Sequence, residues 1–322
     1  MAVVQSREAL RPVISGEIPI LGKFPVDDRL RSQALHCYAL APHMATIAIA
    51  VLMGIVVLLA GNLPWGVLLV PLNLRVAKFV PWAVLPMAIY LWCYWKHIGG
   101  SWGSKATAGE RRANLRANAL SVKVWGASLA AGLLGFATIA VMLVLMARLT
   151  TLPSSAPLMA TEGMPSTTVF VLVVMSSLVA GVTEEAAFRG YMQGPIERRY
   201  GVALAILVNG TAFGLLHFPN HPADVWIMLP YYIAVSAVYG GLTWAANSIL
   251  PALVLHSGGD IWSLGRLWLT GRPEWQLSTA PASAGVDTAF LLSAVAFAVL
   301  AGLTWWAYVA VHSLGARDPN MK

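Results

Sequence analysis

Long apolar runs alternate with short polar segments over most of the chain. Eight of these runs are about as long as a helix that crosses a bilayer, which takes roughly 20 apolar residues. A further apolar stretch, from Leu63 to Val76, is short and contains Pro64 and Pro71, so we expect a loop or re-entrant segment there. The pattern predicts an all-α, polytopic integral membrane bundle of about eight transmembrane helices, at residues 38–60, 77–95, 124–147, 168–193, 202–218, 225–246, 249–268 and 287–311.

The apolar part of the chain shows no internal repeat, so it predicts a single transmembrane domain over residues 38–312. Residues 1–37 are polar and contain three prolines between charges of both signs. We expect them to form a cytoplasmic tail with little fixed structure, and residues 313–322 to form a short C-terminal tail. The first apolar run begins too late for a signal peptide and is expected to stay as an uncleaved anchor.

Composition supports lipid as the main solvent of the chain. Hydrophobic residues make up 58% of it and charged residues 11%, whereas a soluble domain carries about 25% charged residues. The net charge of +7 raises nucleic acid as a partner. The basic residues are spread over short loops, however, and do not gather on one face, so we expect a lipid bilayer and no nucleic acid.

The distribution of Lys and Arg predicts the orientation in the membrane. With the N-terminus inside, 16 of the 21 basic residues fall in inner segments, and the outer segment 149–167 has none. Cytoplasmic loops carry the excess of basic residues in membrane proteins. We therefore expect both termini in the cytoplasm and the chain in the plasma membrane.

A few ionisable residues lie inside the apolar runs, where they are costly and usually functional. Of the 14 acidic residues, only Glu184, Glu185 and Asp260 do so, and His217 and His256 are the clearest histidines of this kind. One such residue alone is more often a packing residue with a satisfied side chain. Five of them on three spans predict a site.

The first cluster is the sequence Thr-Glu-Glu-Ala-Ala-Phe-Arg-Gly at residues 183–190. Glu185 and Arg189 are four residues apart, so on a helix they share a face and can pair. Glu184 is rotated by about 100° from Glu185 and is left free to point into the bundle. The alternative is a salt-bridge network at the end of the helix.

The second cluster ends at His217, which shares a helix face with Phe213. His221 lies four residues further and suggests a metal pair, but Pro219 between them should disrupt the helix, so we expect His221 in a loop. The alternative for His217 is a hydrogen-bonded core histidine.

The third cluster places His256 and Asp260 on one helix face, separated by Gly258 and Gly259. The glycines predict that a neighbouring helix approaches closely at this point. The alternative is a packing seam of small residues in which Asp260 only caps His256. The helical rise puts Glu184 and His217 roughly 20 to 24 Å from the inner side and this third cluster roughly 12 to 18 Å from it, so the clusters can meet inside the membrane.

The three clusters, Glu-Glu-x-x-x-Arg, Phe-x-x-x-His and His-x-x-x-Asp in successive spans, resemble the CPBP family of intramembrane proteases. This family includes type II CAAX prenyl endopeptidases and bacteriocin-processing or self-immunity relatives. The resemblance covers about residues 165–265, including Asn-Ser-Ile-Leu-Pro at 247–251. It implies that Glu184 is the base that activates water, that His217 shares this water, and that His256 with Asp260 holds the oxyanion. Structural support falls to the Glu185–Arg189 pair and to Phe213.

Asp260 departs from the prenyl-processing members of the family, which have Asn at this position. An amide can donate to an oxyanion, whereas an ionised carboxylate repels it. Asp260 is therefore protonated, or orients His256, or helps to bind a cation. We expect no metal or other cofactor; the alternative is zinc held by Glu184, His217, His256 and Asp260.

The favoured function is an intramembrane endopeptidase that cleaves a membrane-associated or lipidated protein or peptide. The first alternative is a non-catalytic immunity or regulatory membrane protein with the same fold. The second is an ion-coupled transporter, since buried Glu and His also build proton relays. Transporters usually show inverted repeats or pairs of broken helices, and neither is apparent in this sequence.

Overall fold

The computed structural model describes residues 28–153, 161–217, 225–276 and 285–317, and His221 lies outside these ranges. Within them every regular element is a helix, which confirms the all-α prediction. The chain falls into two compact units, Met1–Ala48 and Ile49–Lys322, and the candidate site lies in the second.

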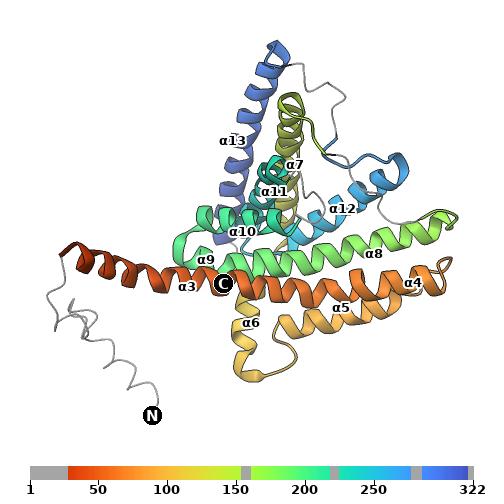
Figure 1. Cartoon of the computed structure of the whole chain (residues 1–322), viewed down its shortest axis with the longest axis horizontal. Helices are drawn as coiled ribbons and strands as arrows, with labels where there is room; N and C mark the ends of the chain where they lie inside the picture. Colours follow the sequence, from red (N-terminus) through yellow and green to blue (C-terminus); the bar gives the residue numbers. More distant parts are fainter. Residues whose placement is uncertain (1–27, 154–160, 218–224, 277–284, 318–322) are drawn as a thin grey trace. The chain divides into compact units, whose positions relative to one another are not determined.

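Each predicted span has a helical counterpart (Figure 1). The fourth span is longer than predicted, because the helical segment Gln193–Tyr200 continues it. The helices are α3 (Asp28–Leu63), α5 (Val84–Ile98), α7 (Val122–Leu149), α8 (Ser166–Glu184) with η4 (Glu185–Met192) and α9 (Gln193–Tyr200), α10 (Val202–Leu216), α11 (Val225–Ala246), α12 (Leu250–Thr270) and α13 (Thr288–Ala316).

Five helical stretches in the described part of the chain are long and apolar enough to cross a membrane. The polytopic membrane architecture is thus confirmed, while the number of eight spans stays a prediction. Helices α5 and α10 have only 15 residues each, and α12 carries the ionisable third cluster. The five stretches are Met44–Val76, Val122–Leu149, Ser166–Tyr200, Trp226–Ala246 and Thr288–Ala316.

The expectation of a loop or re-entrant segment at Leu63–Val76 is wrong. The chain stays helical through a π-helical segment, η2 (Pro64–Leu69), and then through α4 (Val70–Val76). Each proline stands at the start of its segment, Pro64 where the helix changes to π form and Pro71 where it returns to α form. A local π adjustment lets a membrane helix accommodate proline without leaving backbone groups unpaired.

Three helix pairs have the most extensive contacts in the described part of the chain: α7 with α13, α10 with α11, and α8 with α12 (Figure 1). Between α7 and α13 the hydroxyls of Thr138 and Thr304 lie 2.9 Å apart. The Tyr308 hydroxyl of α13 donates to the carbonyl of Val238 on α11, at 3.0 Å. Buried hydrogen bonds of this kind hold helices together where lipid removes the hydrophobic drive for them to associate.

The close approach to α12 occurs one residue before the glycines from which it was predicted. A Cβ added to Gly181 of α8 would clash with the hydroxyl of Ser257 and lie 3.1 Å from its backbone nitrogen. Gly258 has open space around its Cα, and Gly259 meets only ordinary contacts. The assignment of the close contact to Gly258 and Gly259 is therefore wrong; Gly181 allows it, beside His256.

Candidate active site

The first cluster lies where the fourth span changes its helical form. Glu184 is the last residue of α8, and Glu185 begins the π-helical segment η4, all of which is buried. Segments of π-helix inside longer helices are rare and occur frequently at functional sites. The wider turn was not predicted, because the sequence pattern there fits an ordinary helix.

Glu185 and Arg189 form the ion pair that their spacing predicts. The distance from Glu185 Oε1 to Arg189 Nη1 is 3.1 Å, and both side chains are fully buried. The Arg189 guanidinium also lies over the rings of Tyr239 and Phe213, 5.0 and 5.3 Å from their centres. A buried charge needs a partner, and these contacts supply one. Glu185 is therefore inaccessible to a substrate.

Glu185 has a second partner that the sequence did not reveal. Its Oε1 also accepts from Nδ1 of His256 on α12, at 2.7 Å. The His256 ring stacks on Tyr239 of α11, with 4.9 Å between ring centres and 10° between planes. The position and the plane of the imidazole are thus both fixed. A contact between two separate helices has no sequence signal beyond the presence of both groups at intramembrane depth.

The other ring nitrogen of His256 faces two carboxylates. Nε2 lies 3.7 Å from Glu184 Oε2 and 3.6 Å from Asp260 Oδ2. Both distances are longer than an ordinary hydrogen bond and lie within the range of an ion pair. The side chain of Glu184 is 15% exposed and that of Asp260 is 30% exposed. These two carboxylates, unlike Glu185, can meet a substrate.

His217 occupies a different environment from His256. Its Nδ1 lies 2.8 Å from the carbonyl oxygen of Phe213. A carbonyl only accepts, so Nδ1 carries the proton and the Nε2 of the neutral ring is left as an acceptor. The ring stacks on Tyr232, with 4.5 Å between centres and 26° between planes.

Three of the four predicted site residues, Glu184, His256 and Asp260, come together in the structure. Among the described residues no hydrogen bond or ion pair joins His217 to any of them. Phe213 provides an indirect link, because its ring contacts both His217 and the ring of Phe188 in η4, at 4.5 and 5.0 Å. Phe213 thus fills the space between the second cluster and the first.

The zinc alternative requires four ligands around one ion. Among the described residues, no group of three or more His, Cys, Asp or Glu side chains is arranged to hold a metal. The four side chains considered from the sequence do not fit this alternative as they stand. Independence from metal stays a prediction.

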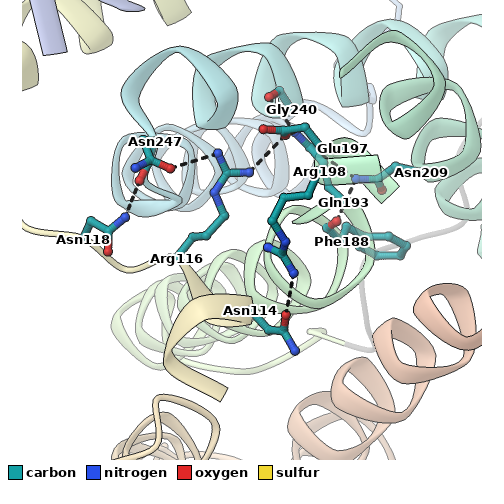
Figure 2. Close-up of polar contacts among 10 residues, drawn as sticks. All are labelled: Asn114, Arg116, Asn118, Phe188, Gln193, Glu197, Arg198, Asn209, Gly240 and Asn247. Atoms are coloured by element: carbon teal, nitrogen blue, oxygen red, sulfur yellow. Dashed lines mark hydrogen bonds and ion pairs between the residues drawn. The ribbon is translucent and has the colours of Figure 1, made fainter. Parts of the chain in front are cut away.

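Residues outside the motifs hold the helices that carry them. Arg116, which follows α6 (Ala108–Leu115), donates from Nη1 to Glu197 of α9 at 3.0 Å and from Nη2 to Asn247 before α12 at 3.2 Å (Figure 2). Its carbonyl also accepts from the backbone nitrogen of Ile249, at 3.0 Å. These contacts of Arg116 with Glu197, Asn247 and Ile249, here called the Arg116 clamp, connect the end of the fourth span to the start of α12. Sequence reasoning gave the first 150 residues no such role.

A second group of contacts satisfies polar groups around η4. Asn209 of α10 donates to the carbonyl of Phe188, at 2.8 Å (Figure 2). Gln193 donates to both Glu197 and the carbonyl of Gly240 on α11, at 2.9 Å each. Side chains of neighbouring helices can in this way stabilise an irregular membrane helix.

The geometry can be compared with known protein families. Residues 166–262 match the family described as type II CAAX prenyl endopeptidase Rce1-like. The predicted family resemblance is confirmed. The match begins at the first residue of α8, ends within α12 and covers less than a third of the 322 residues.

The segment similar to CAAX endopeptidases contains all three motifs and the charged cluster around His256. Together with the apolar helices, it supports an integral membrane protease of CAAX type that acts on a membrane-associated substrate. Arg116 lies outside the matched segment. No curated protein and no solved structure matches the chain.

Proposed function

We propose that the chain is an intramembrane endopeptidase in which Glu184 activates water to hydrolyse a peptide bond of a membrane-associated or lipidated protein or peptide. The observation that carries the proposal is the different accessibility of the two neighbouring carboxylates. Glu185 is fully buried and bound to Arg189 and His256, whereas Glu184 is partly exposed beside Nε2 of His256. One carboxylate supports the site and the other is available for chemistry.

Hydrolysis needs a base, a stabilised oxyanion and a proton for the leaving group. Glu184 takes a proton from water as the water oxygen attacks the carbonyl carbon. Negative charge develops on the carbonyl oxygen, and Nε2–H of a protonated His256 donates to it. The proton on Glu184 then passes to the amide nitrogen as the C–N bond breaks, which gives one carboxylic acid and one amine.

Two further residues assist these steps. His217 has an unprotonated Nε2 that can accept from the attacking water and orient it. Asp260 lies 3.6 Å from Nε2 of His256, which favours the role of orienting this imidazole and supporting its charge over direct contact with the oxyanion.

Proteolysis by purified protein in liposomes tests the proposal. The probes are a prenylated CAAX peptide and an acylated peptide of the same sequence. Glu184→Gln keeps the shape of the side chain but cannot take the proton, so we expect cleavage to fall about 100-fold or more with an unchanged melting temperature. The matched control is Glu162→Gln, because Glu162 lies before α8 and outside the site.

Near-normal cleavage by Glu184→Gln would contradict the role of Glu184 as the base. Cleavage of neither peptide by the wild-type protein would favour the non-catalytic alternative. A preference between the two peptides would show whether the prenyl group itself is recognised.

A further inference from the structure

The chain turns back toward the site after α12. Gly271 adopts a left-handed conformation, with φ of 68°, and ends the helix. The Arg266 guanidinium donates to the carbonyls of Pro273 and Gln276, at 2.6 and 2.9 Å. The indole of Trp275 donates to the carbonyl of Pro153, at 2.8 Å. These bonds fix the return segment, Gly271–Gln276, without using the side chain of Glu274.

Glu274 is directed at two hydroxyl groups on the helices of the site. Its Oε2 accepts from Ser263, at 2.7 Å, and its Oε1 accepts from Tyr231 of α11, at 3.2 Å. Ser263 lies on α12, three residues beyond Asp260, so the two are neighbours on the helix surface. No Lys or Arg in the described ranges forms an ion pair with Glu274. Its charge is therefore stabilised by hydroxyl donors that come from two different helices.

Tyr231 connects this carboxylate to the second cluster. The rings of Tyr231 and Tyr232 pack edge to face, with 5.3 Å between their centres. Tyr232 in turn stacks on the imidazole of His217. Both tyrosines are more than 90% buried, so neither ring can move without displacing its neighbours. A displacement of Tyr231 is thus transmitted to the face of His217.

Three contacts define the orientation of His217: the bond from Nδ1 to the carbonyl of Phe213, the contact with the ring of Phe213 and the stack on Tyr232. The bond from Nδ1 to the carbonyl of Phe213 fixes where Nδ1 points. The imidazole ring can still rotate about the line of this bond. The stack on Tyr232, with the ring of Phe213 against the same imidazole, removes this freedom and so sets where the free Nε2 points. The stack depends on Tyr231, which Glu274 holds.

We propose that Glu274 is a positioning residue for His217: by holding Tyr231 it keeps Tyr232 against the imidazole, so that Nε2 points toward the attacking water. The inference rests on the proposed function, in which His217 orients this water. Glu274 lies outside the segment that matches the endopeptidase family, and no motif pointed to it.

Kinetics on the prenylated peptide test this role. Misplacement of a catalytic group by about 1 Å can cost as much as 100-fold, so we expect Glu274→Ala to lower kcat about tenfold or more with little change in KM. Glu274→Gln keeps an oxygen that accepts from Tyr231 and should retain most of the activity. Tyr231→Phe should reproduce Glu274→Ala, and the double variant should be no slower than either single one.

The control is Ser263→Ala, which removes the other hydrogen bond of Glu274 and leaves the bond to Tyr231. A merely structural role predicts a lower melting temperature for Glu274→Ala, with Glu274→Gln and Ser263→Ala affected similarly and no selective loss of kcat. That result would overturn the proposal, as would normal kcat in Glu274→Ala.

A second measurement does not depend on activity. Nitrogen-15 spectra of the imidazoles report which ring nitrogen of His217 carries the proton. We expect the proton on Nδ1 in all three proteins, because the bond to the carbonyl of Phe213 is kept, and a shifted Nε2 resonance only in Glu274→Ala, where the ring moves relative to Tyr232. An unchanged His217 spectrum in Glu274→Ala would contradict the proposal. If instead the spectrum changes in Glu274→Ala but Glu184→Gln still cleaves normally, the proposed function is contradicted and the positioning of His217 by Glu274 is not.

Discussion

Oε1 of Glu185 accepts a hydrogen bond of 2.7 Å from Nδ1 of His256, and this bond joins the fourth span to α12. The same oxygen lies 3.1 Å from the guanidinium of Arg189. The three side chains form a buried series, Arg189–Glu185–His256, in which the carboxylate is the centre. A second group that orients the imidazole is a recurring feature of hydrolytic sites. Here it directs Nε2 of His256 at the two accessible carboxylates.

The central position of Glu185 predicts a structural effect of its substitution. Glu185→Gln leaves the buried Arg189 guanidinium without a counter-charge, and Arg189→Leu removes the partner of the carboxylate. Breaking a buried ion pair costs about 3 to 5 kcal/mol, so both variants should unfold at clearly lower temperature or denaturant concentration than wild type. Thermal unfolding in detergent measures this.

The control for the buried pair is Glu110→Gln, since Glu110 is exposed on α6. This variant should unfold like the wild type. Wild-type stability in Glu185→Gln would mean that the pair contributes nothing to the fold.

The contact between Gly181 and Ser257 predicts that a methyl group added at residue 181 disturbs the packing of α8 against α12. Gly181→Ala places a Cβ against the backbone and hydroxyl of Ser257, so the helices must separate. His256 is adjacent to Ser257, so a shift of α12 also moves its imidazole. We therefore expect proteolysis to fall at least about tenfold and the free energy of unfolding to fall by about 1 to 3 kcal/mol. Peptide cleavage and thermal unfolding are the measurements.

Gly258→Ala is the matched control, because a Cβ there meets nothing within 4 Å. It should be nearly neutral, and helix propensity alone favours the change. If Gly258→Ala were the more damaging of the two, the close approach would lie on the other face of α12.

Substitution of Asp260 tests whether the activity requires a metal ion. If Asp260 orients His256, Asp260→Asn should keep appreciable activity, since the amide is nearly isosteric with the carboxylate. Activity of both proteins should also resist chelators. Cleavage assays with chelator titration and elemental analysis of the purified proteins make the measurement. Stoichiometric zinc in the wild type, lost together with activity in Asp260→Asn, would show that metal is required.

The charge pattern predicts both termini in the cytoplasm and the 149–167 segment outside. Cysteine labelling of intact cells should modify Glu162→Cys from outside, whereas Arg317→Cys should be labelled only after the cells are permeabilised. The native cysteines, Cys37 and Cys93, are first replaced by serine. Labelling of Glu162→Cys only after permeabilisation would reverse the orientation.

The sequence by itself determined the class of the fold and the position of the three motifs. Lipid requires long apolar helices, so spans are visible as apolar runs, and an ionisable residue stands out within such a run. The pair Glu185–Arg189 was predictable for a similar reason, because four residues along a helix define a neighbour. The loop expected at Pro64 failed because proline indicates a break but does not exclude a local π-helical adjustment.

Only the tertiary structure decided how the motifs meet. The bond from Glu185 to His256, the packing of Gly181 on Ser257 and the clamp at Arg116 all join residues that are more than 70 positions apart. The return of Glu274 toward Tyr231 likewise depends on how the chain turns after α12. Such contacts depend on which faces of separate helices pack together. Hydrophobic pattern does not encode this choice in a membrane, because the lipid-facing and the buried sides of a helix are similarly apolar.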